Sequence, residues 1–367
     1  MAEPNEQQKQ DRAKSIAGEA KSRKQQLKHS KRQVAMVFDL NKCLGCQTCV
    51  IACKTLWTRD EGMEYMWWAT VNTQPGKGTP RDWEKMGGGF HDEEPQAGKL
   101  PTVKEFGEAW KFNYEEVFSG GKGNAAHLKP DSNPDWGPNW DEDQGGGQYP
   151  NSFYFYLPRI CNHCTNPACL EACPRDAIYK REEDGIVLIN ESRCEGYRFC
   201  MEACPYKKIY FNHVRQISQK CILCFPRVEK SVAPACMRQC PGRLRFVGFL
   251  DDENGPIFKL VKKWQVALPL HPDSGTQPNV YYIPPLSPPR FDAEGKIDES
   301  KPRIPTEYLK YLFGDKVDAA LATLKEEMKK TRAGEKSELL DVLIAYEWKS
   351  LFGPFTKDPA ELGPRRA

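Results

Sequence analysis

Residues 43–53 read CLGCQTCVIAC, a run in which four cysteines are separated by two, two and three residues. Three further groups repeat this arrangement with changes, and Tyr197 stands where one of them would have its second cysteine. Four groups of four with one substitution account for all fifteen cysteines. The groups are Cys43, Cys46, Cys49 and Cys53; Cys161, Cys164, Cys169 and Cys173; Cys194, Cys200 and Cys204; and Cys221, Cys224, Cys236 and Cys240.

This bunching favours metal ligation over disulfide bonds. Segments 1–42, 54–160 and 241–367 contain no cysteine, and an odd number of cysteines excludes complete internal pairing. Metal ligands bunch because several thiolates must converge on one small object. Zinc is the competing metal, since it binds paired C-x2-C knuckles. The repetition of a four-cysteine run favours iron–sulfur clusters.

The C-x2-C-x2-C-x3-C run is that of bacterial ferredoxins, where three cysteines hold one cluster and the fourth holds its neighbour. Only residues 174–193 separate groups two and three, so we expect these groups to pair. Groups one and four then pair by elimination. The predicted [4Fe–4S] ligand sets are Cys43, Cys46, Cys49 and Cys240; Cys53, Cys221, Cys224 and Cys236; and Cys161, Cys164, Cys169 and Cys204.

The remaining thiolates, Cys173, Cys194 and Cys200, predict a [3Fe–4S] cluster. The iron opposite Tyr197 would have no ligand to retain it, so Tyr197 marks the vacant corner. Loss of one iron generally raises the reduction potential, which suits a point of electron entry or exit. The alternative is that Tyr197, water or another side chain completes a [4Fe–4S] cluster. His163, inside CNHC, is expected to pack or hydrogen-bond nearby rather than to ligate.

The sequence predicts an α+β fold of two interleaved ferredoxin-like modules, each with two clusters. Strands are expected at 34–40, 177–180, 186–189, 209–211 and 244–250, with a hairpin at Asp184-Gly185. Apolar residues at helical spacing predict two helices near the C-terminus. The first contains Val317, Leu321, Leu324 and Met328. The second contains Leu339, Leu343 and Tyr346 and would end at Gly353-Pro354. Prolines follow the fourth cysteine of the last three groups and are expected in the first turn of a helix: Pro174, Pro205 and Pro241.

The same pattern predicts the domain organisation. We expect a mobile arm at 1–32, one module from 33–57 and 206–260, a loop-rich insertion at 58–152, a second module at 153–205, and a Pro-rich and helical extension at 261–367. Seven of the nine tryptophans lie within 54–160. They predict either loops pinned by buried aromatic rings or a surface that faces a partner.

Composition and absent motifs restrict the function. A net charge of +3 is too balanced for a general nucleic-acid binder. No stretch reaches the roughly 18 consecutive apolar residues of a membrane span. The first 32 residues have no apolar core of a secretory signal and no twin-arginine before an apolar run. Dinucleotide-binding, P-loop, zinc-protease and nucleophile-elbow motifs are missing, so a chain that carries electrons would need a partner with the reaction centre.

The sequence resembles the β subunits of type II enzymes of the dimethyl-sulfoxide-reductase family of molybdenum enzymes. Members include respiratory nitrate reductase, nitrite oxidoreductase, ethylbenzene dehydrogenase, and selenate and chlorate reductases. The likeness covers roughly residues 33–290 and is carried by VAMVFDLNKCLGCQTCVIACKTLW at 34–57, WGPNWDED at 136–143, residues 156–173, AIYKREEDGIVLI at 177–189 and ACPYKKIYF at 203–211. The family carries three [4Fe–4S] clusters and one [3Fe–4S] cluster, in agreement with the ligand sets above.

Two departures make the chain more similar to the periplasmic branch of this family. The cytoplasmic nitrate reductases have Trp at the position of Tyr197, and their C-terminal region is longer. The resemblance implies a catalytic α subunit with bis-molybdopterin guanine dinucleotide and a cluster of its own, together with a γ subunit carrying haem b. It also implies export to the periplasm with an α subunit that bears a twin-arginine signal; the cytoplasmic face of the membrane is the alternative. The β subunit itself would be non-catalytic.

Other readings remain open at this stage. The partner could be a formate dehydrogenase or another enzyme served by a four-cluster β subunit. The chain could also be a self-contained iron–sulfur protein, or a zinc-structured scaffold that lacks acid-labile sulfide. The substrate of the complex and the direction of electron flow are not readable from this chain, because another chain binds the substrate.

Overall fold

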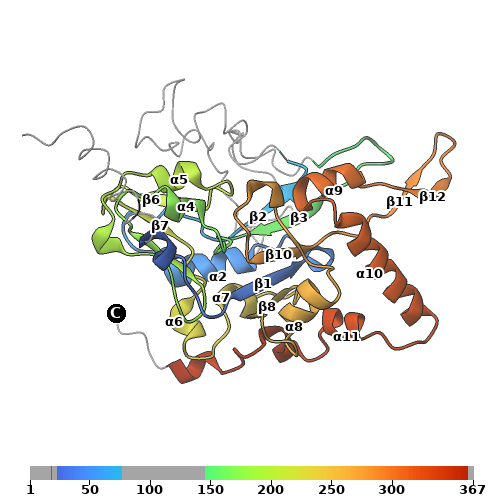
Figure 1. The fold of residues 1–367 in the computed structure, drawn as a ribbon. Coiled ribbons are helices and arrows are strands. Elements are labelled where there is room, and N and C mark those ends of the chain that lie inside the picture. The colour runs from blue at the N-terminus through green and yellow to red at the C-terminus, as the bar shows by residue number, and fades with distance from the viewer. Residues whose placement is uncertain (1–17, 19–22, 77–144, 363–367) are drawn as a thin grey trace, which may run out of the picture. The chain divides into compact units, whose positions relative to one another are not determined.

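A four-stranded sheet begins at the apolar run before the first cysteine group. All six residues of β1 (Val34–Asp39) are buried, as expected for a strand covered on both faces. It pairs in parallel with β10 (Val280–Ile283) and antiparallel with β8 (Arg245–Phe249), and β9 (Leu268–Pro269) completes the order β8-β1-β10-β9. This computed structural model describes residues 18, 23–76 and 145–362 (Figure 1).

Two small hairpins accompany the second and third cysteine groups. In the first, β4 (Ile178–Lys180) pairs antiparallel with β5 (Val187–Ile189), which confirms the predicted hairpin around Asp184-Gly185. In the second, β6 (Ile209–Asn212) pairs antiparallel with β7 (Ile217–Lys220). With helices α4 (Ala168–Glu171) and α5 (Phe199–Ala203), these hairpins lie to one side of strands β1, β8 and β10 in Figure 1.

Each group has a helix that begins one residue before the cysteine at the group's third position, which in the third group is Cys200. The four helices are α2 (Thr48–Trp57), α4 (Ala168–Glu171), α5 (Phe199–Ala203) and α7 (Ala235–Arg238). The prediction that a helix begins at the proline after the fourth cysteine is therefore wrong. Three of the helices end before that cysteine, because proline disfavours helical backbone at the preceding residue. Only α2, whose fourth cysteine is followed by Lys54, continues through it.

The predicted strand and helix boundaries hold with small differences. Leu40 leaves β1 and opens a 3-10 helix (Leu40–Lys42), because the Asp39 side chain accepts a hydrogen bond from the Asn41 backbone. Both C-terminal helices are confirmed. The second ends at Ile344 rather than at Gly353-Pro354, since Ala345 adopts a left-handed conformation, and Tyr346 is exposed beyond it.

The remaining elements are short. The strands are β2 (Thr70–Gln74), β3 (Phe155–Arg159), β11 (Pro289–Phe291) and β12 (Ile297–Pro302), and the α-helices are α6 (Phe225–Val228), α8 (Pro256–Phe258), α9 (Thr306–Phe313), α10 (Val317–Arg332) and α11 (Glu338–Ile344). A π-helical turn covers Lys259–Lys263, and further 3-10 turns cover Glu191–Arg193, Pro272–Ser274, Trp348–Phe352 and Pro359–Leu362. Short helices mixed with small sheets confirm an α+β fold. Within the described part of the chain, no helix has both the length and the apolar character needed to cross a bilayer.

The chain divides into two units by its internal contacts. One unit contains the residues up to Val71 and those from Tyr156 onward, and the other spans Asn72–Phe155. All the cysteines belong to the first unit. Most of the predicted arm at 1–32 lies outside the described residues. So do residues 77–144 of the predicted insertion, which include Trp83, Trp110, Trp136 and Trp140.

Candidate metal centre

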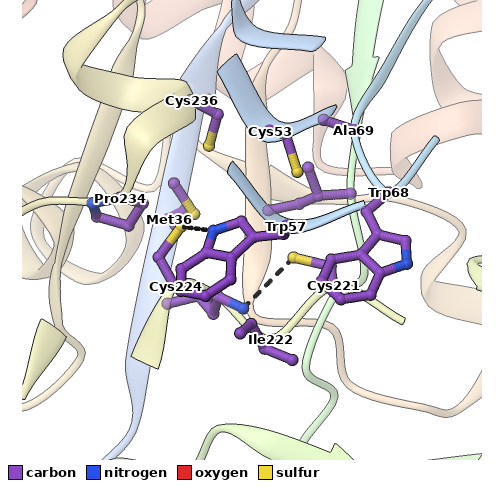
Figure 2. A pocket seen from close by; sticks show the side chains of 12 residues that line it. Met36, Cys53, Trp57, Trp68, Ala69, Cys221, Ile222, Cys224, Pro234 and Cys236 are labelled. Carbon is purple, nitrogen blue, oxygen red and sulfur yellow. Dashed lines mark hydrogen bonds between the residues drawn. The ribbon is translucent and has the colours of Figure 1, made fainter. Parts of the chain in front are cut away.

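Three cavities in the first unit are each lined by four cysteines that come from two different groups. We name these cysteines the first, second and third sets. The first set is Cys43, Cys46, Cys49 and Cys240; the second is Cys53, Cys221, Cys224 and Cys236; the third is Cys161, Cys164, Cys169 and Cys204. Figure 2 shows the second set around its cavity, with the indole rings of Trp57 and Trp68 beside it.

Three further cysteines form the fourth set. Cys200, buried in α5, interacts electrostatically with both Cys194 and Cys173. Backbone N–H groups point at two of these sulfurs: Ala177 donates to the Cys173 Sγ at 3.3 Å, and Ser218 donates to the Cys194 Sγ at 3.4 Å. The fourth set therefore brings together three thiols, with no cysteine in the place of a fourth.

The four sets follow one another in space. Cys49 of the first set and Cys236 of the second are close enough to interact electrostatically, and so are Cys221 of the second set and Cys161 of the third. Helix α5 connects the third set to the fourth, because Cys200 lies within it and Cys204 caps its C-terminus. The order along the protein is thus first, second, third and fourth.

Burial disfavours the ionised form of several of these thiols, because it raises their pKa. Burial, together with neighbouring cysteines of the same set, raises the pKa of Cys164 and of Cys236 to about 12. Burial likewise raises the pKa of Cys200 to about 11. Cys46 is exposed and differs: a hydrogen bond from the Thr48 hydroxyl, at 3.4 Å from the sulfur, lowers its pKa. Converging buried thiolates need positive charge, which a bound metal cluster supplies.

Side chains from distant segments donate to two of the sulfurs. The Trp57 indole Nε1–H donates to the Cys224 Sγ at 3.0 Å (Figure 2), and the Arg245 guanidinium donates to the Cys49 Sγ, also at 3.0 Å. The backbone of Leu223 donates to the Cys221 Sγ at 3.4 Å. Such N–H···S contacts are the ones by which a protein tunes an iron–sulfur cluster.

His163 lines the third cavity and is fully buried. Its Nδ1 accepts a hydrogen bond from the Val187 backbone at 3.1 Å, and burial, with the nearby Lys220 and Lys180, holds its pKa well below the usual value. The neutral ring therefore carries its proton on Nε2, which has no partner among the described residues. Both amide atoms of the neighbouring Asn162 are also buried without a partner there. A hydrogen-bonded His163 agrees with the sequence prediction, and the unpartnered donors, His163 Nε2 and Asn162 Nδ2, suit a cavity that holds a group with hydrogen-bond acceptors.

The loop around Tyr197 repeats the loop around Cys46. A 3-10 turn precedes both loops, capped by the side chain of Asp39 in one and of Asn190 in the other. A left-handed glycine then comes directly before Cys46 and before Tyr197, and a left-handed residue directly after each. A side chain on Gly45 would meet the Tyr156 ring, and one on Gly196 would meet the Gln216 carbonyl oxygen. Tyr197 therefore occupies the position of Cys46, half-exposed and stacked on Phe199.

The donor sets fit iron–sulfur clusters. Across the described residues, no three His, Cys, Asp or Glu side chains are grouped as they would be around a single metal ion. The cysteine sets instead surround cavities whose other walls are mainly apolar, and backbone and side-chain N–H groups point at the sulfurs. Thiolates with N–H donors in an apolar surround are the environment in which proteins hold such clusters.

Comparison with known proteins agrees with this geometry. A family described as "4Fe-4S dicluster domain" matches residues 152–250. The selenate reductase β subunit of Thauera selenatis is 56% identical over 328 residues, which cover 88% of this chain and 99% of that protein. The dimethylsulfide dehydrogenase β subunit of Rhodovulum sulfidophilum is 54% identical, covering 88% and 98%. The respiratory nitrate reductase β subunit of Haloferax mediterranei is 58% identical, covering 85% and 90%.

The chain belongs to the β subunits of the type II dimethyl-sulfoxide-reductase family of molybdenum enzymes. The resemblance predicted from the sequence is thereby confirmed. This β subunit is an iron–sulfur protein with a ferredoxin-like dicluster domain, and it serves an oxidoreductase as an electron-transfer subunit.

Sequence reasoning missed the two side chains that donate to sulfur from afar. No role for Arg245 was predicted from the sequence, although an arginine at the start of the buried strand RFVGF is an available signal. Trp57 stood out only as one of many tryptophans, because nothing in the local sequence relates it to Cys224.

Proposed function

We propose that this β subunit relays single electrons through three [4Fe–4S] clusters and one [3Fe–4S] cluster. The observation that carries the proposal is the arrangement of fifteen cysteines as four sets in spatial order. When bound, clusters of this kind each take up and release one electron. The first, second and third sets would each hold a [4Fe–4S] cluster, and the fourth set a [3Fe–4S] cluster.

The proposed architecture is that of two interleaved ferredoxin-like modules. Residues 33–57 and 206–260 would form the module of the first and second sets, and residues 153–205 the module of the third and fourth. The exchange of cysteines between groups supports this division, since Cys240 joins the set of Cys43 and Cys204 joins the set of Cys161. The insertion at 58–152 and the extension at 261–367 complete the proposed organisation.

The vacant corner of the fourth cluster is proposed to lie at Tyr197. The repeated loop supports this assignment, because it gives Tyr197 the backbone position that Cys46 has in the first set. A neutral phenol is a poor iron ligand beside three thiolates, so the iron at that corner would be lost.

The proposed partners and location follow from the family. The β subunits of selenate reductase, dimethylsulfide dehydrogenase and nitrate reductase are the relatives, and each is named as part of a larger enzyme. We therefore propose a molybdopterin-containing α subunit at the end of the first set and a haem b γ subunit at the end of the fourth. We also propose a periplasmic complex, in which this chain is exported together with its α subunit.

Metal analysis of the complex tests the proposal. The chain is expressed with its proposed α subunit and purified anaerobically, and iron, acid-labile sulfide and zinc are measured per β subunit. We expect about fifteen irons (3 × 4 + 3) beyond those of α, and an oxidised protein with the paramagnetic signal of a three-iron cluster. Zinc without acid-labile sulfide, or a fully loaded protein with far fewer irons, would contradict the proposal.

Trp57→Phe is expected to lower the reduction potential of the second-set cluster alone. The indole N–H donates to the Cys224 sulfur, and such a donor stabilises the more negative, reduced form. Losing one hydrogen bond worth about 1 kcal/mol corresponds to roughly 40 mV for a one-electron couple. Redox titration followed by electron paramagnetic resonance measures the shift. Trp67→Phe is the control, because Trp67 lies near Lys54 and does not line the second-set cavity; equal shifts in both variants would refute the role of the hydrogen bond.

A further inference from the structure

Arg245 is a fully buried cation with no anionic partner among the described residues. Its side chain is 1% exposed and is the largest of the fully buried side chains. The Nη2 group donates to Cys49, whereas Nε and Nη1 have no partner in the part of the chain that the structure describes. No ion pair between described carboxylates and cations includes Arg245. A buried guanidinium left in this state is costly, so the site requires negative charge close by.

The guanidinium lies between the first and second sets. Arg245 lines the cavity of the first set, and it is also near enough to Cys236 of the second set to interact with it electrostatically. Its neighbour across the sheet is Phe38, whose ring centroid is 4.3 Å from the guanidinium carbon. This contact and the strand β8 hold the cation beside Cys49 and Cys236, which also interact with each other.

The charge of Arg245 is permanent. An arginine side chain keeps its proton in almost every protein environment. The planar fork of N–H groups can donate in two directions at once, which an ammonium on a flexible chain does less well.

We propose that Arg245 is a fixed cation shared by two clusters, and that it raises the reduction potentials of both the first-set and the second-set cluster. The inference rests on the proposed function and deepens it. Reduction adds one negative charge to each cluster, so a nearby positive charge stabilises the reduced form more than the oxidised form. The N–H group donated to the Cys49 sulfur acts in the same direction. Arg245 is a positioning and tuning residue here and ligates no iron.

The experiment is a redox titration of the intact complex carrying Arg245→Met or Arg245→Lys, followed by electron paramagnetic resonance, with iron counted per β subunit. In Arg245→Met, we expect the reduced form of both clusters to lose at least about tenfold in relative stability, a fall of about 59 mV in each midpoint. The other two midpoints stay unchanged. Arg245→Lys keeps the charge but not the fork, so both midpoints fall by less. Arg243→Met, an exposed arginine two residues away, is the matched control and leaves all four midpoints unchanged.

The results of this titration distinguish a shared cation from a general structural role of Arg245. Unchanged midpoints in a fully loaded Arg245→Met or Arg245→Lys variant would overturn the proposal, and so would a shift of only one cluster. Loss of the first-set and second-set clusters alone would support the shared cation, whereas loss of all four in both variants would overturn it in favour of a general structural role. The wild-type complex is titrated in parallel. If it lacks four clusters, the proposed function fails irrespective of the variants.

Discussion

In Tyr197→Cys, the iron content is expected to rise from about fifteen to about sixteen per chain (15 + 1), as the fourth set becomes able to hold [4Fe–4S]. Residue 197 has the same backbone position in its loop as Cys46 has in the first loop, with a left-handed glycine before it and a left-handed residue after it. A thiol there would therefore point where a fourth ligand is needed. The substitution requires no repacking of a core, because the Tyr197 side chain is 57% exposed.

Two readouts accompany the change in iron. The paramagnetic signal of the oxidised three-iron cluster disappears, and the midpoint of this cluster falls by on the order of 100 mV or more, because a fourth thiolate adds negative charge. Tyr197→Ser is the control, since it removes the ring without supplying a thiol and leaves the iron count at its wild-type value. An unchanged signal in a stable Tyr197→Cys protein would mean that residue 197 does not face the vacant corner. A wild-type protein that already holds sixteen irons would mean that tyrosine, water or another group completes the cluster.

The reciprocal substitution, Cys46→Ala, is expected to remove one iron from the first set and to interrupt electron transfer. Cys46 is the exposed member of its set, while Cys49 is buried and hydrogen-bonded to Arg245. Three thiolates thus remain in place, as in the fourth set. The resulting cluster would have a higher potential than its neighbours, and an uphill step of about 100 mV slows one-electron transfer by more than about tenfold.

Electron flow from the α subunit to an artificial acceptor measures this effect, alongside iron and molybdenum content. Molybdenum in the α subunit is expected to stay at the wild-type level, which separates loss of transfer from loss of assembly. Cys46→Ser is a matched control with nearly the same volume, and partial retention of the fourth iron there would show that the ligand rather than the packing matters. Undiminished electron flow in Cys46→Ala would show that the first set is not on the path.

Local sequence was sufficient for much of the fold. The buried run at 34–39, the hairpin at Asp184-Gly185 and the helix that begins at Val317 each depend on patterns within a few residues. Some helix ends differ from the predicted ones, and their causes are local but are not visible in the spacing of apolar residues. Ala345 ends its helix by adopting a left-handed conformation. The prolines after Cys173, Cys204 and Cys240 lie in turns and disfavour helical backbone before them, so the preceding helices end there.

The spacing of the cysteines, by itself, determined that each of four groups would present several thiols close together, because cysteines separated by only two or three residues cannot lie far apart. Only the tertiary structure decided what surrounds those thiols. Arg245 contacts a sulfur 196 positions away in the sequence, and Trp57 contacts one 167 positions away. Which donor meets which sulfur depends on how strand β8 and helix α2 pack against segments far along the chain, and no local pattern encodes that packing.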